Sequence, residues 1–133
     1  MDYTVFSTEF PDVKVFYNEP LKNYTFTKTG GRAAILIFPK DKKEASAVMH
    51  WLREHNIPTT ILGNASNVII KDGGISGAVI MLNDMSHLTV SGTQIVAEGG
   101  VALIDVSKEA AKNGLTGLEF ACGIPGSVGG AIF

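Results

Sequence analysis

The sequence contains little of what marks several large classes of protein. Its 133 residues include one cysteine, Cys122, so no internal disulfide can form and a reducing compartment is expected. Lysine and arginine number 11 against 13 acidic residues, without a basic stripe, which argues against a nucleic-acid partner. No apolar run approaches the ~20 residues that span a bilayer, and the first residues lack a signal-peptide pattern. We expect a soluble, cytoplasmic chain without membrane insertion, in which Cys122 is a small buried hydrophobe.

Several familiar site motifs are also missing. No G-x-G-x-x-G follows the first predicted strand, and the glycines of Lys28–Gly31 come after the lysine rather than before it, so neither a Rossmann site nor a P-loop is predicted. His50 and Glu54 are four residues apart but lack a third ligand, which favours a solvated pair over a metal site. Ser127 does not lie in a G-x-S-x-G elbow. We therefore predict no metal-ligating residue in this chain.

What is present is the pattern of a globular α+β chain, with 45% hydrophobic and 18% charged residues. Asp41 and Glu44 have the spacing of a capping box at the start of a helix, and Asn56 and Gly114 suit the left-handed position after a helix. Ser91-Gly92-Thr93 indicates a hairpin turn. The predicted strands are 33–38, 57–62, 68–70, 78–82, 87–90 and 94–97, and the predicted helices are 41–55 and 102–113.

This order of elements predicts mixed α and β structure in two sub-layers. Residues 1–23 are expected to be an N-terminal appendage, about 24–72 a small β-α-β subdomain, and about 73–133 a second, strand-rich subdomain that is incomplete at its C-terminus. The chain ends on Ala131-Ile132-Phe133, without a polar residue. We expect this apolar tail to fray and to promote self-association, because the cover of a longer protein is missing.

Two glycine-containing segments are the candidate binding residues. The last twenty residues contain six glycines among apolar neighbours, with one carboxylate, Glu119, and no base. Glycines dense in an apolar segment indicate backbone that passes close to something, either a ligand or another element. Gly63–Asn67 follows a predicted strand and can form an anion-binding nest, or simply a tight turn capped by its own asparagines. Together the two segments could hold the two ends of a dinucleotide.

These segments, in this order, resemble the UDP-N-acetylenolpyruvoylglucosamine reductases, the MurB flavoenzymes of bacterial cell-wall synthesis. The resemblance runs from about residue 23 to residue 133. It rests on Tyr24-Thr25-Phe26 before Thr29-Gly30-Gly31, on Leu62–Asn67 with Asp72-Gly73-Gly74, and on Gly117–Phe120 leading to Ile124–Ala131. The extra N-terminal segment resembles the form of this enzyme in Gram-positive bacteria.

The resemblance implies an FAD-binding fold of the vanillyl-alcohol oxidase and p-cresol methylhydroxylase (PCMH) type, with FAD held non-covalently between two α+β subdomains. It implies NADPH as electron donor and a UDP-sugar as substrate, which is reduced to UDP-N-acetylmuramate. Residues implied at the FAD pyrophosphate are Gly63, Asn64, Ala65, Ser66 and Asn67. Residues implied at the flavin side are Ile124, Pro125, Gly126, Gly129 and Gly130.

The chain departs from the family pattern in two respects. Ala65 stands where glycine is commoner, and its Cβ restricts the backbone angles of the nest. The arginine, serine and glutamate that carry the family's chemistry would follow residue 133, so the chain alone is expected to be inactive. Two other interpretations stay open: a non-catalytic nucleotide- or anion-binding module, and a structural domain whose glycines serve packing alone.

Overall fold

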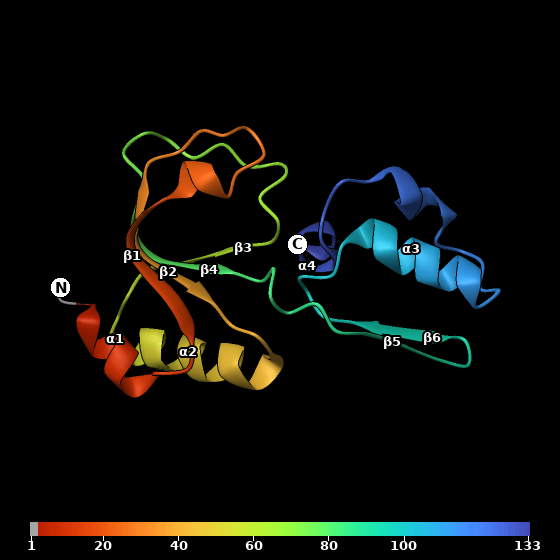
Figure 1. The fold of residues 1–133 in the computed structure, drawn as a ribbon, viewed down its shortest axis with the longest axis horizontal. Coiled ribbons are helices and arrows are strands. Elements are labelled where there is room, and N and C mark those ends of the chain that lie inside the picture. The colour runs from red at the N-terminus through yellow and green to blue at the C-terminus, as the bar shows by residue number, and fades with distance from the viewer. Residues whose placement is uncertain (1–2) are drawn as a thin grey trace.

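The computed structural model describes residues 3–133, which form two lobes (Figure 1). The first lobe contains a four-stranded sheet in the order β1-β2-β4-β3. Its strands are β1 (Lys14–Pro20), β2 (Arg32–Phe38), β3 (Thr59–Leu62) and β4 (Ile75–Met81). β1 is antiparallel to β2, whereas β2, β4 and β3 are mutually parallel. The carboxyl ends of β3 and β4 therefore lie at one edge, which faces the second lobe (Figure 1).

Both faces of this sheet are buried, which the unbroken apolar sequences of β2 and β4 predict. Helices α1 (Thr4–Glu9) and α2 (Lys42–Glu54) cover one face (Figure 1). Short helix η1 (Leu21–Asn23) and the loop after β3 cover the other. The core under the helices consists of Phe6, Val13, Ile35, Ile37, Val48, Leu52, Ile57, Ala78 and Ile80. The core under the loop consists of Leu21, Ala33, Leu36, Phe38, Leu62, Ala65, Ile70, Val79 and Met81.

Helix α2 begins and ends as its sequence predicts. The Asp41 side chain accepts a hydrogen bond from the Glu44 N–H at 2.8 Å, and the Glu44 carboxylate accepts one from the Lys40 N–H at 2.8 Å. Both capping residues therefore satisfy N–H groups that the helix start leaves unpaired. Asn56 has a φ of 51°, which confirms the left-handed residue expected after the helix.

The second lobe consists of the hairpin β5 (Leu88–Ser91) and β6 (Gln94–Ala97), helix α3 (Leu103–Lys112), short helix η2 (Glu119–Gly123) and the five-residue helix α4 (Val128–Ile132). The hairpin and α3 confirm the predictions for 87–97 and 102–113. The buried Ser107 hydroxyl donates to the Leu118 carbonyl at 2.9 Å, which ties the segment before η2 to α3. The C-terminal part of the chain is thus fixed to the helix that precedes it.

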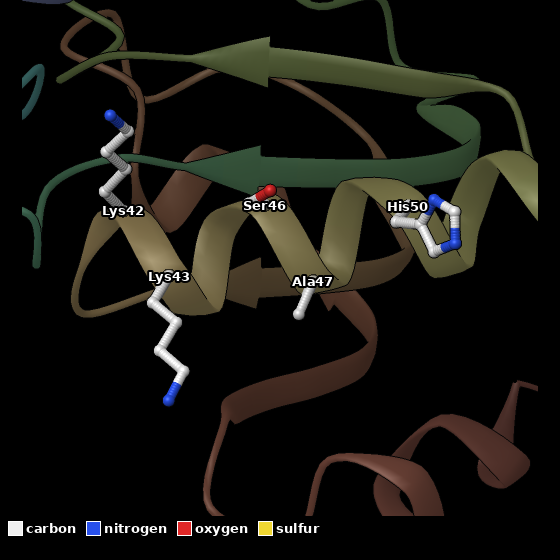
Figure 2. A pocket seen from close by; sticks show the side chains of 5 residues that line it. All are labelled: Lys42, Lys43, Ser46, Ala47 and His50. Carbon is white, nitrogen blue, oxygen red and sulfur yellow. The ribbon is translucent and has the colours of Figure 1, made fainter.

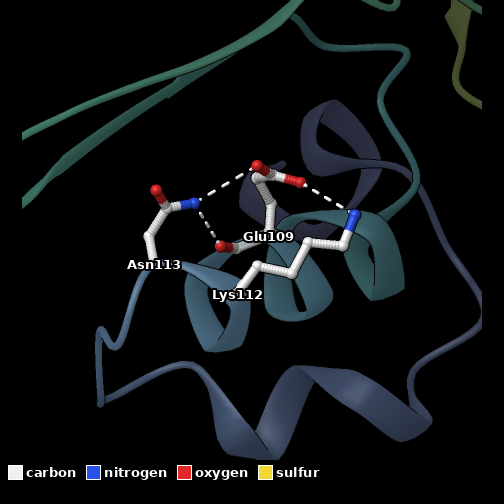
Figure 3. Close-up of polar contacts among 3 residues, drawn as sticks. All are labelled: Glu109, Lys112 and Asn113. Carbon is white, nitrogen blue, oxygen red and sulfur yellow. Dashed lines mark hydrogen bonds and ion pairs between the residues drawn. The ribbon is translucent and has the colours of Figure 1, made fainter.

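Helix α3 ends in a set of local polar contacts (Figure 3). The Asn113 amide donates to the Glu109 carbonyl at 2.8 Å and to the Glu109 carboxylate at 3.2 Å, and the Lys112 ammonium donates to the same carboxylate at 3.3 Å. Gly114 follows with a φ of 66°, as expected for the residue after a helix. An amide on a terminal carbonyl and a lysine in the last turn favour the helix end. These residues have a structural role.

The predicted strand 68–70 is wrong. Residues 63–74 form a loop without strand pairing, in which Ile70 is 7% exposed and Ile69 is 84% exposed. Ala65 and Ile70 both pack onto the second face of the sheet, so the loop crosses that face instead of extending along an edge. The Gly31 N–H donates to the Lys71 carbonyl at 3.0 Å and holds the far end of the loop.

The lobes also divide the chain differently from the expected subdomains. Of residues 1–23, expected to be an appendage, residues 3–23 contribute α1 and the edge strand β1, and Phe6 is fully buried in the core; residues 1–2 lie outside the described part. The expected boundary near residue 72 precedes β4, which pairs with β2 and β3 inside the first sheet. Structurally, the first lobe runs to Met81 and the second starts near Leu88.

Two further observations concern surfaces. Cys122 is exposed at the end of η2, so the expectation of a buried cysteine is wrong. Among the helices of residues 3–133, none combines the length and the apolar character that crossing a bilayer requires.

Candidate cofactor site

The first candidate segment, Gly63–Asn67, directly follows the carboxyl end of β3. Ala65 anchors it, because its side chain is 4% exposed within the second core and its carbonyl accepts a hydrogen bond from the Phe26 N–H at 3.2 Å. Ala65 has a φ of 50°, a left-handed conformation that costs a non-glycine residue about 1–2 kcal/mol. Burial of its methyl group offsets part of that cost. Ala65 therefore adopts the left-handed backbone conformation that glycine usually takes at such a position.

The backbone of this loop carries donors that the protein does not use. Within residues 3–133, the N–H groups of Asn64, Ala65 and Asn67 donate to no protein acceptor. The Ser66 N–H donates to the Asn64 side-chain oxygen at 3.3 Å, so Asn64 does cap its own turn. Successive N–H groups around a left-handed residue form a concavity that binds anions. The loop can therefore receive an anionic group such as a phosphate.

The second candidate segment, 123–130, uses more of its donors internally than its sequence suggests. The N–H of Val128 donates to Val101 at 2.8 Å, that of Gly129 to Gly99 at 2.9 Å, and that of Gly130 to the Ser127 hydroxyl at 3.3 Å. The N–H groups of Val128, Gly129 and Gly130 are therefore already paired within the chain. Gly129 lies so close to Gly99 that a Cβ would stand 3.0 Å from the Gly99 carbonyl. Packing against the chain itself thus accounts for Gly129.

Two other glycines of this segment have no such explanation. Gly123 and Gly126 have no heavy atom within 4 Å of the position that a Cβ would occupy, and neither has a positive φ. Neither internal packing nor backbone conformation in residues 3–133 therefore requires glycine at these positions. Bare backbone on an open surface is what close approach by a flat ligand needs.

The structure brings the two predicted segments together, although they are about sixty residues apart in sequence. The Ser66 hydroxyl donates to the Pro125 carbonyl at 2.7 Å. A Cβ on Gly63 would lie 2.2 Å from the Ser127 hydroxyl, which shows how closely the two backbones approach. The exposed residues Ile124 and Gly130 flank this junction on the second lobe.

The chemistry available at this junction is that of binding. Residues 63–67 and 123–130 contain no acidic, basic or histidine side chain, so neither segment can transfer a proton through a titratable group. Glu119 does not change this, because it is exposed and accepts a local hydrogen bond from the Gly117 N–H at 2.8 Å. Unused N–H donors beside an uncovered glycine surface fit a dinucleotide, which has an anionic centre and planar ends.

A hollow of the described surface lies elsewhere. It measures about 620 Å³ and is lined by five residues of a single helix, α2 (Figure 2). The side chains of Lys42 and Lys43 extend to different sides of this helix (Figure 2). His50, also in the lining, pairs with Glu54 at 3.2 Å on the exposed surface, as the sequence suggested. Because the hollow is open and formed by one helix face, it is not the binding site that the glycine segments indicate.

Two glycines that shape this junction were not predicted from the sequence. Gly99 and Gly100 sit at the contact between the lobes, where a Cβ on Gly100 would lie 1.8 Å from the Leu82 carbonyl. The signal was present as a glycine pair two residues after the end of the predicted strand 94–97. These glycines set how closely the tail can approach the loop after β3.

Comparison with known proteins agrees with this geometry. The family model described as the FAD binding domain matches residues 33–133. The UDP-N-acetylenolpyruvoylglucosamine reductase of Pediococcus pentosaceus is 49% identical over 133 residues, which are 100% of this chain and 44% of that protein. This chain thus spans less than half the length of that relative.

Solved structures extend the comparison to the fold. The structure of UDP-N-acetylenolpyruvylglucosamine reductase (MurB) from Thermus caldophilus matches with a TM-score of 0.67 and 33% identity, over 90% of this chain and 41% of that one. Cholesterol oxidase from Brevibacterium sterolicum matches with a TM-score of 0.65 at 16% identity, over 91% of this chain and 24% of that one. The expected PCMH-type fold, shared with such oxidases, is confirmed, and so is its mixed α+β character.

Proposed function

Because the chain belongs to the FAD binding domain family, we propose that it supplies part of the FAD site of an NADPH-dependent reductase acting on UDP-N-acetylglucosamine enolpyruvate. The observation that carries the proposal is the junction of Gly63–Asn67 with residues 123–130, where unused backbone donors meet an uncovered glycine surface. The reductase assignment draws on the names of the relatives. The product would be UDP-N-acetylmuramate, a precursor of peptidoglycan.

In this proposal the two segments have different tasks. The N–H groups of Asn64, Ala65 and Asn67 hold the FAD pyrophosphate, and Gly63 and Ser66 complete the loop that presents them. Anionic oxygens bind well to converging backbone donors, which need no counter-charge from a side chain. The flavin side is lined by Ile124, Pro125, Gly126, Gly129 and Gly130. Of these, Gly126 offers the most open backbone and Gly129 acts through its packing on Gly99.

FAD, bound non-covalently, would carry a hydride from NADPH to the enolpyruvyl group of the UDP-sugar. This chain's residues bind and orient, and neither segment has a titratable side chain that could supply the proton. We expect the chain alone to be inactive as a reductase. We place it in the cytoplasm, where NADPH is available, and we expect self-association through the exposed apolar side chains Phe120, Ile124, Ile132 and Phe133.

The proposal is tested by a chimera. Residues 1–133 are joined to the part of the Pediococcus pentosaceus reductase that follows its matched region, and that reductase itself is the control. The chimera is expected to retain FAD and to oxidise NADPH only when UDP-N-acetylglucosamine enolpyruvate is present. A folded chimera that retains FAD without substrate-dependent oxidation would instead support a non-catalytic nucleotide-binding module.

A further inference from the structure

Two serines join the loop after β3 to the tail of the second lobe. The Ser66 hydroxyl donates to the Pro125 carbonyl at 2.7 Å, across 59 positions of sequence. Ser127 is 2% exposed and its hydroxyl fills the space beside Gly63 that a side chain would otherwise take. We call these two contacts the clasp. It connects the two segments that the proposed function assigns to FAD.

Each half of the clasp is fixed within its own lobe. On the first lobe, Ala65 is buried in the core next to Ser66. On the second, the Leu103 N–H donates to the Gly126 carbonyl at 2.8 Å and the Val128 N–H donates to Val101 at 2.8 Å, so Pro125 and Ser127 are held against the start of α3. The clasp is therefore a contact between two anchored surfaces, and its loss removes one of the contacts between the lobes.

The clasp forms from protein groups alone. A serine hydroxyl has one proton to donate, and that of Ser66 is directed to Pro125. Proline fixes the φ of Pro125, which limits the freedom of the backbone that carries this carbonyl before any ligand binds. The Ser66 hydroxyl thus acts on the protein partner, while the backbone donors around it remain for an anion.

We propose that the clasp sets the spacing of the two FAD segments before the cofactor binds, and that Ser66 and Ser127 are positioning residues of the site. The proposal rests on the function proposed above. When the site is ordered before FAD binds, less of the binding free energy is lost in ordering it. A chain without the clasp therefore binds FAD more weakly. In such a chain, residues 123–133 also open more often in the absence of FAD.

The test uses the 133-residue chain and two measurements on each variant. Ser66→Ala removes the hydroxyl, Ser66→Thr keeps one, and Ser46→Ala removes an exposed serine of α2 as a matched control. Amide hydrogen exchange of residues 123–133 is measured without FAD, and FAD affinity is measured by titration. Losing one net hydrogen bond corresponds to a change of roughly two- to tenfold. We expect Ser66→Ala to raise both the amide exchange rate and the FAD dissociation constant by a factor in this range. Ser66→Thr and Ser46→Ala should leave both quantities close to those of the original chain.

Two results would overturn the proposal. Unchanged exchange with weakened FAD binding would mean that Ser66 touches the cofactor itself, and unchanged exchange with unchanged binding would mean that the contact positions nothing. If the unmodified chain binds no FAD, the proposed function fails, yet the exchange rates still report whether the clasp holds the lobes. Ser127→Ala gives a second, independent variant, which is expected to speed exchange in the same residues because Ser127 also caps Gly130.

Discussion

The contact between Gly63 and Ser127 gives a double-mutant test of how the lobes meet. In Gly63→Ala the new methyl carbon would stand 2.2 Å from the Ser127 hydroxyl, far inside van der Waals contact. Ser127 is 2% exposed, so the hydroxyl cannot move aside without disturbing its neighbours and its bond from the Gly130 N–H. Overpacking of this kind costs about 1–3 kcal/mol. We expect the free energy of unfolding to fall by that amount.

The same substitution should cost little once Ser127 is alanine. The Ser127 Cβ lies 3.5 Å from the position of the new methyl group, an ordinary contact distance, so removing the hydroxyl removes the clash. Ser127→Ala alone should cost about 1 kcal/mol through loss of its bond to the Gly130 N–H. The double variant is therefore expected to be about as stable as Ser127→Ala, which corresponds to a coupling energy of roughly 1–3 kcal/mol.

Urea denaturation followed by circular dichroism measures all four members of this cycle. Gly73→Ala is the matched control, because no heavy atom lies within 4 Å of its would-be Cβ and its φ is not positive. It should change stability by no more than about 0.5 kcal/mol. If the costs of Gly63→Ala and Ser127→Ala simply add, the two residues are not in contact and the junction described here is wrong.

Three further predictions concern other parts of the chain. Gly100→Ala would place a Cβ 1.8 Å from the Leu82 carbonyl, so we expect a loss above about 3 kcal/mol or failure to fold, and a mild effect in urea denaturation would contradict the packing at this position. Burial of Tyr24, together with its hydrogen bond to the Glu19 carboxylate and the charge of that group, raises the pKa of the phenol above 10.0. The neutral phenol is thereby favoured in the folded state, and its stabilising contribution is lost as pH rises through the raised pKa, so Tyr24→Phe should flatten the alkaline decline in stability. Cys122 is exposed and should react with a thiol reagent at similar rates in the folded and denatured chain, whereas strong protection would show that it is covered.

Sequence patterns predicted the elements whose signals are local. Helix α2 has its start encoded by Asp41 and Glu44 and its end by Asn56, all within one turn of the residues they cap. The hairpin of β5 and β6 likewise depends on the turn at Gly92, whose φ is 57°. Such features need no information about distant residues, which is why they could be read directly.

The elements that sequence patterns missed depend on distant partners. Strand β1 is mostly exposed and mixes charged with aromatic residues, so only its pairing with β2 identifies it. Val68–Ile70 is as apolar as a strand, but packing of Ile70 on the face of the sheet makes it a loop. At the candidate site, both segments were predicted, whereas the internal use of the Val128 and Gly129 donors was not, because their acceptors come from residues 99–101. Which glycines pack and which stay open is a tertiary property.

The central claim is that Gly63–Asn67 and residues 123–130 together bind FAD, and a titration of the 133-residue chain tests it most directly. Melting temperature and the visible flavin spectrum are followed with the original chain and with Gly126→Val, whose side chain would cover the open glycine surface. FAD at a hundred times its dissociation constant adds about 2.7 kcal/mol of stability, which is a rise of about 10 °C for a chain of this size. We expect that rise with a perturbed flavin band for the original chain, and a much smaller rise for Gly126→Val at unchanged stability without FAD. No shift at millimolar FAD, or equal shifts for both chains, would contradict it.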